Sequence, residues 1–493
     1  MAMRELMALA DMEEARNRPY LNSGGPLDIF NGKYIPKVGG GYALSGGMGL
    51  TMSVIGKANT FKSTLMNGAA INTCARFPES TFVLYDTEYS VSDKNRLAGM
   101  SSLHLDDPDK RALHLTDLKR RIKITDPTED AAESLDAWFD FMKVIRDDKV
   151  KNYKDFEVET EVIDLETGKP YRMLIPTFVN IDSWSEAAVR QLNVKNEEFN
   201  ADTEMKDQRT INMEEGWQKK RLMRQLPKIC AQGGIYTYIS GHLGKKISMD
   251  GKPNSKDLTY MGQDEAAKAM GNNFYFLMSA IIKISNARVL VDKNDRRLTD
   301  YPSDEHVSGA ELQELDLTLI RSKNSPTGFQ TQLVSSQRFG IMNGLSYYNS
   351  LRNNKYYGLG TPNKVKNPIL GDLNLGRTKI FDLSLNYKVE RALELTYQLF
   401  FIQNNWSFRD QPVDYSIPIE VFAEKLQGSG YAIDDILNSR GWWTYKSAPG
   451  IDRSYLTLPD ILEIINGNYK PKLIAVSSPR TKESSAKTPV IVV

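Results

Sequence analysis

A short polar segment between an apolar run and a helix-forming run constrains the fold of this chain most strongly. Residues 50–55 are apolar and β-prone, and residues 65–71 have a helical composition. A strand, a tight loop and a helix that opens with Lys-Ser-Thr together bind phosphate groups, because loop N–H groups and the helix N-terminus face the anion. The predicted phosphate-binding segment consists of Gly56, Lys57, Ala58, Asn59, Thr60, Phe61, Lys62, Ser63 and Thr64.

This loop departs from the usual pattern at one position. The pattern G-x-x-x-x-G-K-[ST] has a second glycine directly before the lysine, and Phe61 stands there in this chain. In such a loop Lys62 contacts the β- and γ-phosphates of ATP, and Ser63 ligates Mg²⁺. ATP and Mg²⁺ are therefore the expected cofactors. A strand-to-helix turn with a chance lysine is the alternative interpretation of the same residues.

Three later strand-like runs end in polar residues that suit an ATPase. The run from Phe82 leads to Glu88, the run from Thr177 ends at Asp182, and a third run ends at His242. Ligands bind at the carboxyl ends of parallel strands, so Glu88 is placed to polarise water and Asp182 to hold Mg²⁺. Each run alone also fits a strand followed by an ordinary polar turn. Their order behind a phosphate loop favours ATP hydrolysis.

Composition sets the broad class of the protein. The 493 residues exceed what one hydrophobic core holds, so two or three domains are expected. No apolar run is long enough to span a bilayer and no leader-like segment opens the chain, which predicts a cytoplasmic protein without a membrane partner. Cys74 and Cys230 lie in apolar contexts and are expected to be buried thiols. A net charge of +1 restricts any nucleic-acid contact to local surfaces.

The pattern along the chain predicts an α/β core between two smaller regions. Strand-like and helix-like runs alternate over residues 41–340, which is typical of a mostly parallel sheet between helices. Within that core, residues 156–176 alternate as an inserted β-hairpin, expected to be exposed. We expect an N-terminal oligomerisation arm over residues 1–40, a mainly helical C-terminal domain over residues 341–470 and a flexible basic tail over residues 471–493.

As an ordered set, these motifs over roughly residues 40–340 resemble the RecA-type recombinase family. Residues 46–56 resemble the entry to its P-loop ATPase core, and the Phe-Lys-Ser form of the loop is most similar to the UvsX-like recombinases of T4-like phages. The resemblance implies that Glu88 is the catalytic glutamate and that Asp182 is the Walker B aspartate. It also implies that His242 senses the γ-phosphate, and for a phage-encoded protein it places the chain in the cytoplasm of a bacterial host.

The same resemblance extends to residues that would act between subunits and on DNA. Arg321 and Lys323 resemble two lysines that reach the ATP of a neighbouring subunit. The segment 270–276 resembles a helix start that closes the second DNA-binding loop. The candidate first DNA loop, residues 191–213, holds three basic and five acidic residues and fits a solvated acidic loop equally well. The residues expected to contact DNA are Lys245, Lys246, Lys252, Lys256, Gly271 and Asn272, although the four lysines also fit a solvated charge run.

The function implied by the resemblance is homologous pairing in DNA recombination, repair and replication. Subunits would self-associate into a helical filament on single-stranded DNA, bind ATP at each interface and exchange strands with double-stranded DNA. Single-strand-binding and loader proteins are candidate partners. A RecA-fold replicative DNA helicase is the first alternative, and a DNA-coating protein with a degenerate nucleotide site is the second. The intact lysine, serine, glutamate and aspartate favour an active site, and no helicase scaffold domain is recognisable before residue 40.

Overall fold

The computed structural model describes residues 18–471 with gaps, so part of the predicted N-terminal arm and nearly all of the predicted tail lie outside the described residues. In helix α9 the side chains of residues 205–212 also lie outside them. The gaps within the described range are 92, 104, 106–107, 130–131, 165–166, 190–204, 247–255, 272, 292–293, 301–308, 357–365, 372, 377–382, 384, 406–407, 409–412 and 446–453.

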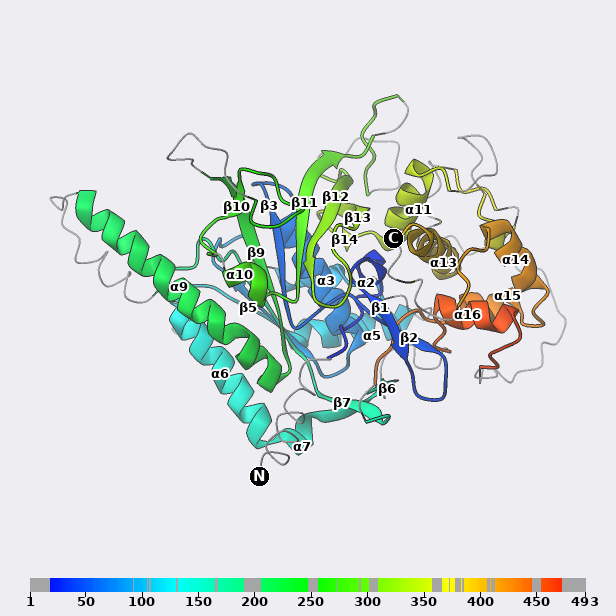
Figure 1. Ribbon diagram of the computed structural model, residues 1–493, viewed down its shortest axis with the longest axis horizontal. Coiled ribbons are helices and arrows are strands. Elements are labelled where there is room, and N and C mark those ends of the chain that lie inside the picture. Colours follow the sequence, from blue (N-terminus) through cyan, green and yellow to red (C-terminus); the bar gives the residue numbers. More distant parts are fainter. Residues whose placement is uncertain are drawn as a thin grey trace.

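The centre of the molecule is a ten-stranded mixed sheet (Figure 1). Its order is β14-β13-β12-β11-β3-β9-β8-β4-β5, with β10 paired to β9. The strands from β11 to β5 run parallel, and β12, β13 and β14 continue the sheet in antiparallel fashion. This confirms the predicted α/β class with a mostly parallel sheet. The strands are β3 (Thr51–Gly56), β4 (Thr81–Asp86), β5 (Ile122–Thr125), β8 (Thr177–Asp182), β9 (Ile235–Lys245), β10 (Glu265–Ala267), β11 (Ala280–Val289), β12 (Gln313–Ser322), β13 (Gln330–Ser336) and β14 (Gly340–Ile341).

Helices cover both faces of the sheet, and side-chain alternation divides the core between them. Along β4, Phe82 and Leu84 join the hydrophobic cluster on the α3 side, whereas Val83 and Tyr85 join the cluster that contains α6 and α9 side chains. Parallel strands buried on both faces have near-continuous apolar sequences, as these do. Both cysteines are buried and free. The helices of this region are α3 (Lys62–Arg76), α4 (Lys94–Gly99), α5 (Pro108–Arg121), α6 (Leu135–Lys151), α7 (Tyr153–Phe156), α9 (Met205–Gly233) and α10 (Asn273–Leu277).

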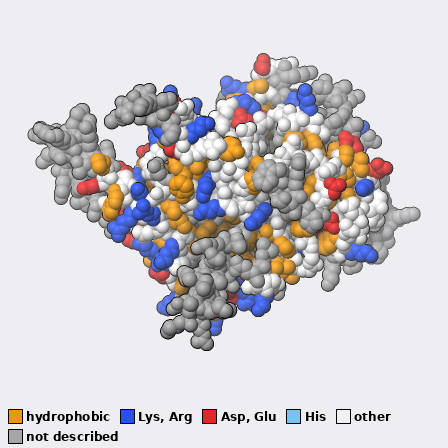
Figure 2. Space-filling model, viewed as in Figure 1, with side chains coloured by type: hydrophobic (Ala, Val, Ile, Leu, Met, Phe, Trp, Pro, Cys, Tyr) orange, Lys and Arg blue, Asp and Glu red, His pale blue; other side chains and the backbone are white. Residues whose placement is uncertain are grey.

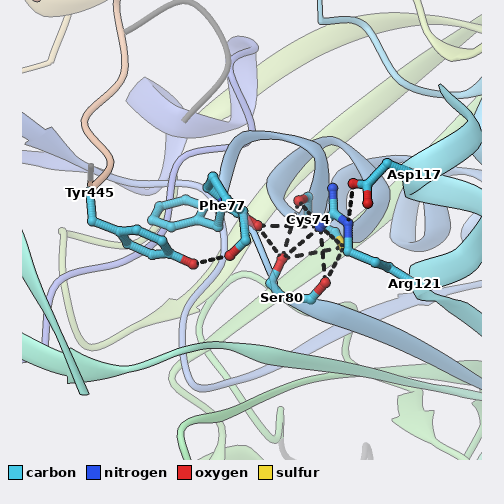
Figure 3. Close-up of polar contacts among 7 residues, drawn as sticks. Cys74, Phe77, Ser80, Asp117, Arg121 and Tyr445 are labelled. Carbon is cyan, nitrogen blue, oxygen red and sulfur yellow. Dashed lines mark hydrogen bonds and ion pairs between the residues drawn. The ribbon is translucent and has the colours of Figure 1, made fainter. Parts of the chain in front are cut away.

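The helix that begins at the phosphate loop, α3, is capped at its other end by an arginine from α5 (Figure 3). One guanidinium nitrogen of Arg121 donates to the carbonyls of Cys74 and Ser80, each at 2.9 Å, and to that of Phe77 at 3.3 Å. Asp117 pairs with the same guanidinium at 2.9 Å. The last carbonyls of a helix have no partner within the helix, so a cation there satisfies them and favours the helix dipole. Arg121 thus fixes α3 at the end far from the loop.

The chain after residue 341 forms helices that lie at one end of the core, away from α6 and α9 (Figure 1). Their apolar side chains, such as Leu393 and Phe422, belong to the same buried cluster as Leu65 and Met66 of α3. These elements are α11 (Asn343–Asn353), η2 (Pro368–Leu370), α13 (Tyr387–Gln403), α14 (Ile419–Gln427), α15 (Ile433–Leu437) and α16 (Leu458–Ile465), with α2 (Pro26–Phe30), β1 (Lys33–Pro36) and β2 (Tyr42–Ser45) packed beside them.

An antiparallel hairpin, β6 (Glu157–Ile163) and β7 (Pro170–Leu174), occupies the segment in which an inserted hairpin is expected. The expectation that it is exposed holds for Glu157, Glu159 and Arg172 but is wrong for Val162, which is 1% exposed and bridges to the chain beside β1. Glu161 also pairs with the buried Arg440 of the C-terminal region at 2.7 Å. The hairpin therefore ties the N-terminal and C-terminal regions together.

A buried ion pair joins the start of the core to the C-terminal helices. Lys37 Nζ lies 2.5 Å from Asp460 Oδ2, and the two side chains are 7% and 0% exposed. Asp460 also caps α16 with Thr457 and accepts a hydrogen bond from the Tyr42 N–H at 2.8 Å. Both charges are removed from water, so each depends on the other for compensation.

We predict that Asp460→Asn lowers the free energy of unfolding by about 3–5 kcal/mol, because it leaves the Lys37 ammonium buried without a counter-charge. Urea unfolding followed by circular dichroism would measure this loss. The double variant Lys37→Met/Asp460→Leu removes both charges and should lose less than the two single variants combined. An unchanged urea midpoint for Asp460→Asn would contradict the role of this pair.

Candidate nucleotide-binding site

The backbone of the phosphate loop has the conformation of an anion-binding nest. Asn59 and Phe61 have φ values of 56° and 59°, so both lie in the left-handed region. Such residues between right-handed ones turn successive N–H groups toward one concave side, where an anion binds. Phe61 stands where the usual pattern has glycine, and its left-handed backbone accounts for that preference. The conformation costs a residue with a side chain about 1–2 kcal/mol, and packing of the partly buried Phe61 ring on the core offsets this.

Two contacts fold the loop back over the end of β3. A Cβ atom on Gly56 would lie 2.6 Å from Thr60 Oγ1, so only glycine fits at this position. Thr60 and Lys62 both donate to the carbonyl of Lys57, each at 2.8 Å. Burial lowers the pKa of Lys62, and the carboxylates of Asp182 and Glu88 act in the opposite direction. The structure thus brings together Lys62 and the two predicted acids.

One oxygen of the buried Asp182 carboxylate accepts a hydrogen bond, and the other accepts none within the part of the chain that the structure describes. Its Oδ1 accepts a hydrogen bond from Ser240 Oγ at 2.6 Å, whereas the buried Oδ2 accepts no hydrogen bond from the described residues. Burial raises the pKa of Asp182, and the hydroxyls of Ser240 and Ser63 lower it. A buried carboxylate oxygen needs a partner, and a hard cation satisfies it well. Ser63 and Asp182 therefore fit Mg²⁺.

Sequence analysis did not identify Ser240, which orients the predicted Mg²⁺ ligand. Residues two apart on a strand share a face, so the Ser-Gly-His order of β9 puts Ser240 and His242 on the same side of the sheet. That spacing is the signal from which Ser240 could have been found.

Glu88 faces His242 at the mouth of the loop. The distance from Glu88 Oε1 to His242 Nε2 is 3.4 Å, and the side chains are 35% and 24% exposed. His242 is directly opposite Gly56 in the parallel pairing of β9 with β3, which places it beside the phosphate loop. The neighbouring acid, Asp86, has a different task, because it accepts hydrogen bonds from the N–H groups of Glu88 and Val91 at 3.2 and 2.6 Å. Asp86 shapes the turn that presents Glu88.

The two predicted trans cations do not join this cluster within one chain. Arg321 is level with Ile281 of β11, which is level with Ser53 in the middle of β3. Lys323 lies further toward the amino end of β3, because its N–H donates to the carbonyl of Ser279, which bonds to Thr51. Lys323 Nζ is 3.4 Å from the carbonyl of Leu277. The Arg321 guanidinium lies 5.9 Å from the centre of the Phe276 ring. Within one chain, Arg321 and Lys323 therefore lie apart from the cluster of Lys62, Glu88 and Asp182.

Two of the candidate DNA-binding residues, Lys245 and Lys246, lie where β9 pairs with β10 to form a hairpin (Figure 1). The expectation that His242 ends its strand is wrong, since β9 continues to Lys245 because β10 pairs with residues 243–245. Lys245 and Lys256 are exposed, whereas Lys246 pairs with Asp257 at 2.5 Å. Gly271 is exposed with φ 64° before α10. Lys252, Asn272 and most of the candidate first loop lie outside the described residues.

Comparisons with known proteins add little to this geometry. No protein-family model matches the chain, and no curated protein does. A solved structure of the RadB recombinase is similar over 65% of this chain and 98% of its own, with 17% sequence identity and a TM-score of 0.32. Likeness at this level does not establish a shared function. Among the described residues, no helix has the length and apolar character to cross a bilayer.

We predict that Glu88→Gln retains ATP binding but lowers the hydrolysis rate by about 10²-fold or more, because the water loses its general base. Lys62→Ala should instead weaken ATP binding itself, since the β- and γ-phosphates lose their cation. Binding of a fluorescent ATP analogue and steady-state phosphate release would separate the two effects. Glu424→Gln, which changes an exposed acid on α14, is the matched control. Near-normal turnover of Glu88→Gln would place the general base elsewhere.

Proposed function

We propose that this chain is an ATP-dependent recombinase that polymerises on single-stranded DNA and pairs it with a homologous duplex. The observation that supports the proposal is that two groups of predicted site residues lie toward opposite ends of the strands. Lys62, Glu88 and His242 lie at the carboxyl edge of the parallel strands, and Arg321 and Lys323 lie toward the other edge. Head-to-tail contact between subunits would bring the two edges together, and such contacts build open helical filaments when the rotation does not close.

In the proposed mechanism, the loop and its neighbours first fix the triphosphate. The N–H groups of the nest and the Lys62 ammonium bind the phosphates, while Ser63 and Asp182 would hold Mg²⁺. The cation supplies neutralisation of phosphate charge when it is bound. Ser240 keeps the Asp182 carboxylate in place through its 2.6 Å hydrogen bond.

Residues from both sides of the interface then act on the γ-phosphate. Glu88 accepts a proton from the attacking water. His242, which lies opposite Gly56 of the phosphate loop, donates a hydrogen bond to a γ-phosphate oxygen. Arg321 and Lys323 of the adjacent subunit neutralise charge that develops in the transition state, as an arginine finger does. Hydrolysis depends on assembly under this arrangement, because neither half of the site is sufficient.

The link to DNA runs along β9. His242 lies three positions before Lys245, within the strand that leaves the sheet and pairs with β10. Loss of the γ-phosphate would remove the partner of His242 and change the position of the hairpin that contacts DNA. Hydrolysis would thereby loosen the filament from its strand. Loader and single-strand-binding proteins, and a bacterial cytoplasm as the setting, belong to the same proposal.

A replicative helicase is the second candidate, because a closed ring would join the same two edges of the sheet. Electron microscopy with single-stranded DNA and a non-hydrolysable ATP analogue distinguishes the two candidates. Helical filaments, together with homology-dependent strand exchange, would support a recombinase. Closed rings with ATP-driven unwinding would support a helicase and contradict our proposal. Binding of DNA with no nucleotide effect would favour a DNA-coating protein.

We predict that Lys62→Ala and Arg321→Ala, each inactive alone, regain ATP hydrolysis when they are mixed. In a random equimolar assembly, about a quarter of the interfaces join an intact loop to intact cations, so activity should approach a quarter of wild type. Phosphate release across a series of mixing ratios would measure it. Lys62→Ala mixed with Glu88→Gln is the control without rescue, since both changes fall in the same half-site. No recovery despite confirmed co-assembly would exclude the trans arrangement.

A further inference from the structure

One helix presents a face whose composition neither the ATPase site nor the core explains. From residue 213 onward, the buried positions of α9 follow one side of the helix, and they include Met223, Leu226 and Cys230. The opposite side carries exposed residues at intervals of three and four, which places them in a single stripe. We call this stripe the α9 face, and it consists of Met213, Trp217, Lys220, Arg221, Arg224 and Lys228.

The α9 face is cationic, and none of its six residues is acidic. Four of the six are Lys or Arg, and Figure 2 shows such side chains gathered over α9. The two acids beside it in sequence, Glu214 and Glu215, are partly buried, and Glu215 pairs with the buried Lys219 at 2.7 Å. In the part of the chain that the structure describes, Lys220, Arg221 and Lys228 form no ion pair. For a chain with a net charge of +1, this is a local concentration of positive charge.

A tryptophan stands within these cations. The Trp217 side chain is 63% exposed, whereas Trp138, Trp184, Trp442 and Trp443 are buried. An exposed aromatic ring between cations suits a flexible polyanion with free bases, because bases stack on the ring while phosphates contact the cations. A duplex keeps its bases stacked inside and offers no such partner. From Trp217 to Lys228 the helix rises roughly 16 Å, which spans several phosphates.

The α9 face is continuous with the proposed DNA-binding elements. The Arg224 guanidinium lies within 2.9 Å of the Asn273 side-chain amide, at the start of α10. Asn273 follows the exposed Gly271, and α10 packs against α9. A strand that leaves the β9–β10 hairpin could therefore continue past α10 onto α9.

We propose that the α9 face is a binding site for single-stranded DNA, in which Trp217 stacks on a base and Lys220, Arg221 and Lys228 contact phosphates. The inference rests on the proposed function and adds a site to it. The acidic segment before α9 is then not the DNA-contacting part of this region. The helix that follows it makes the contact.

Affinity for a fluorescent oligothymidylate tests the stacking step. Trp217→Ala should raise the dissociation constant by about five-fold or more, because loss of one stacked base costs at least about 1 kcal/mol. Trp217→Phe should retain most of the affinity, because its ring can still stack on a base. Binding of a duplex of equal length should change much less. Tyr153→Ala, which removes another exposed aromatic ring on α7, is the matched control and should bind like wild type. The difference in DNA-induced fluorescence quenching between wild type and Trp217→Phe would report on Trp217 directly.

The salt dependence of binding tests the phosphate contacts. Lys220→Gln/Arg221→Gln should lower the slope of log affinity against log salt by about 1.4, since each single-strand phosphate contact contributes about 0.7. Lys119→Gln/Arg120→Gln removes an adjacent exposed Lys-Arg pair from α5 and should leave the slope unchanged.

The outcomes distinguish the site from the function. If wild type binds single-stranded DNA and forms filaments but the α9 variants do the same with equal affinity and slope, the site is wrong and the proposed function stands. If Lys119→Gln/Arg120→Gln lowers DNA affinity and the salt slope as much as Lys220→Gln/Arg221→Gln does, binding depends only on overall charge and the site is also wrong. If the α9 variants bind polyglutamate more weakly than wild type does but bind DNA equally well, the site is wrong and the α9 face is a docking surface for an acidic protein. Absence of any DNA binding by wild type would overturn both proposals.

Discussion

The convergence of parallel strands on one edge of the sheet determines where chemistry can occur in this molecule. β3, β4, β8 and β9 all run in the same direction, so the residues after them meet at a single edge. Lys62, Asp182, Glu88 and His242 come from four separate segments and are brought together by that geometry alone. The loop conformation depends on it as well, because Gly56 ends β3 against Thr60 and the nest begins at once. A shift in the register between these strands would move all four residues out of contact with one another.

Much of this cluster could be predicted from the sequence, for a physical reason. An apolar run that ends in an acid has its direction and its edge fixed once the sheet is parallel, so Glu88 and Asp182 needed no structure to be grouped with the phosphate loop. The unusual Phe61 did not prevent this, because the loop depends on backbone conformation, and Phe61 adopts the left-handed conformation that glycine adopts more easily. This part of the fold is predictable because its strand, loop and helix each have a recognisable local sequence pattern.

The remaining features depend on long-range packing that no local pattern encodes. The hairpin β6–β7 alternates as an exposed hairpin would, yet Val162 is buried because distant segments cover it. Ser240 gains its task only when β9 lies beside β8, and the length of β9 depends on its pairing with β10 across residues outside the described range. The buried pair of Lys37 and Asp460 joins residues 423 positions apart. Each of these features depends on a contact with a residue that is distant in the sequence, so no local pattern predicts it.

Under the proposed function, the arrangement of charges would make ATP hydrolysis depend on assembly. Lys62 is a partly desolvated cation with two carboxylates near it, and one buried oxygen of Asp182 accepts no hydrogen bond from the described residues, so this site would be balanced by the proposed ATP and Mg²⁺. The proposed counterpart, Arg321 and Lys323, lies toward the edge that the same chain cannot use. Under the proposed function, the carboxylates at one edge of a subunit would face the cations at the opposite edge of its neighbour. This attraction favours a single head-to-tail orientation. His242 and the proposed DNA-binding Lys245 lie on the same strand, β9, so under the proposed function a change at the γ-phosphate would reach the DNA contact through one element.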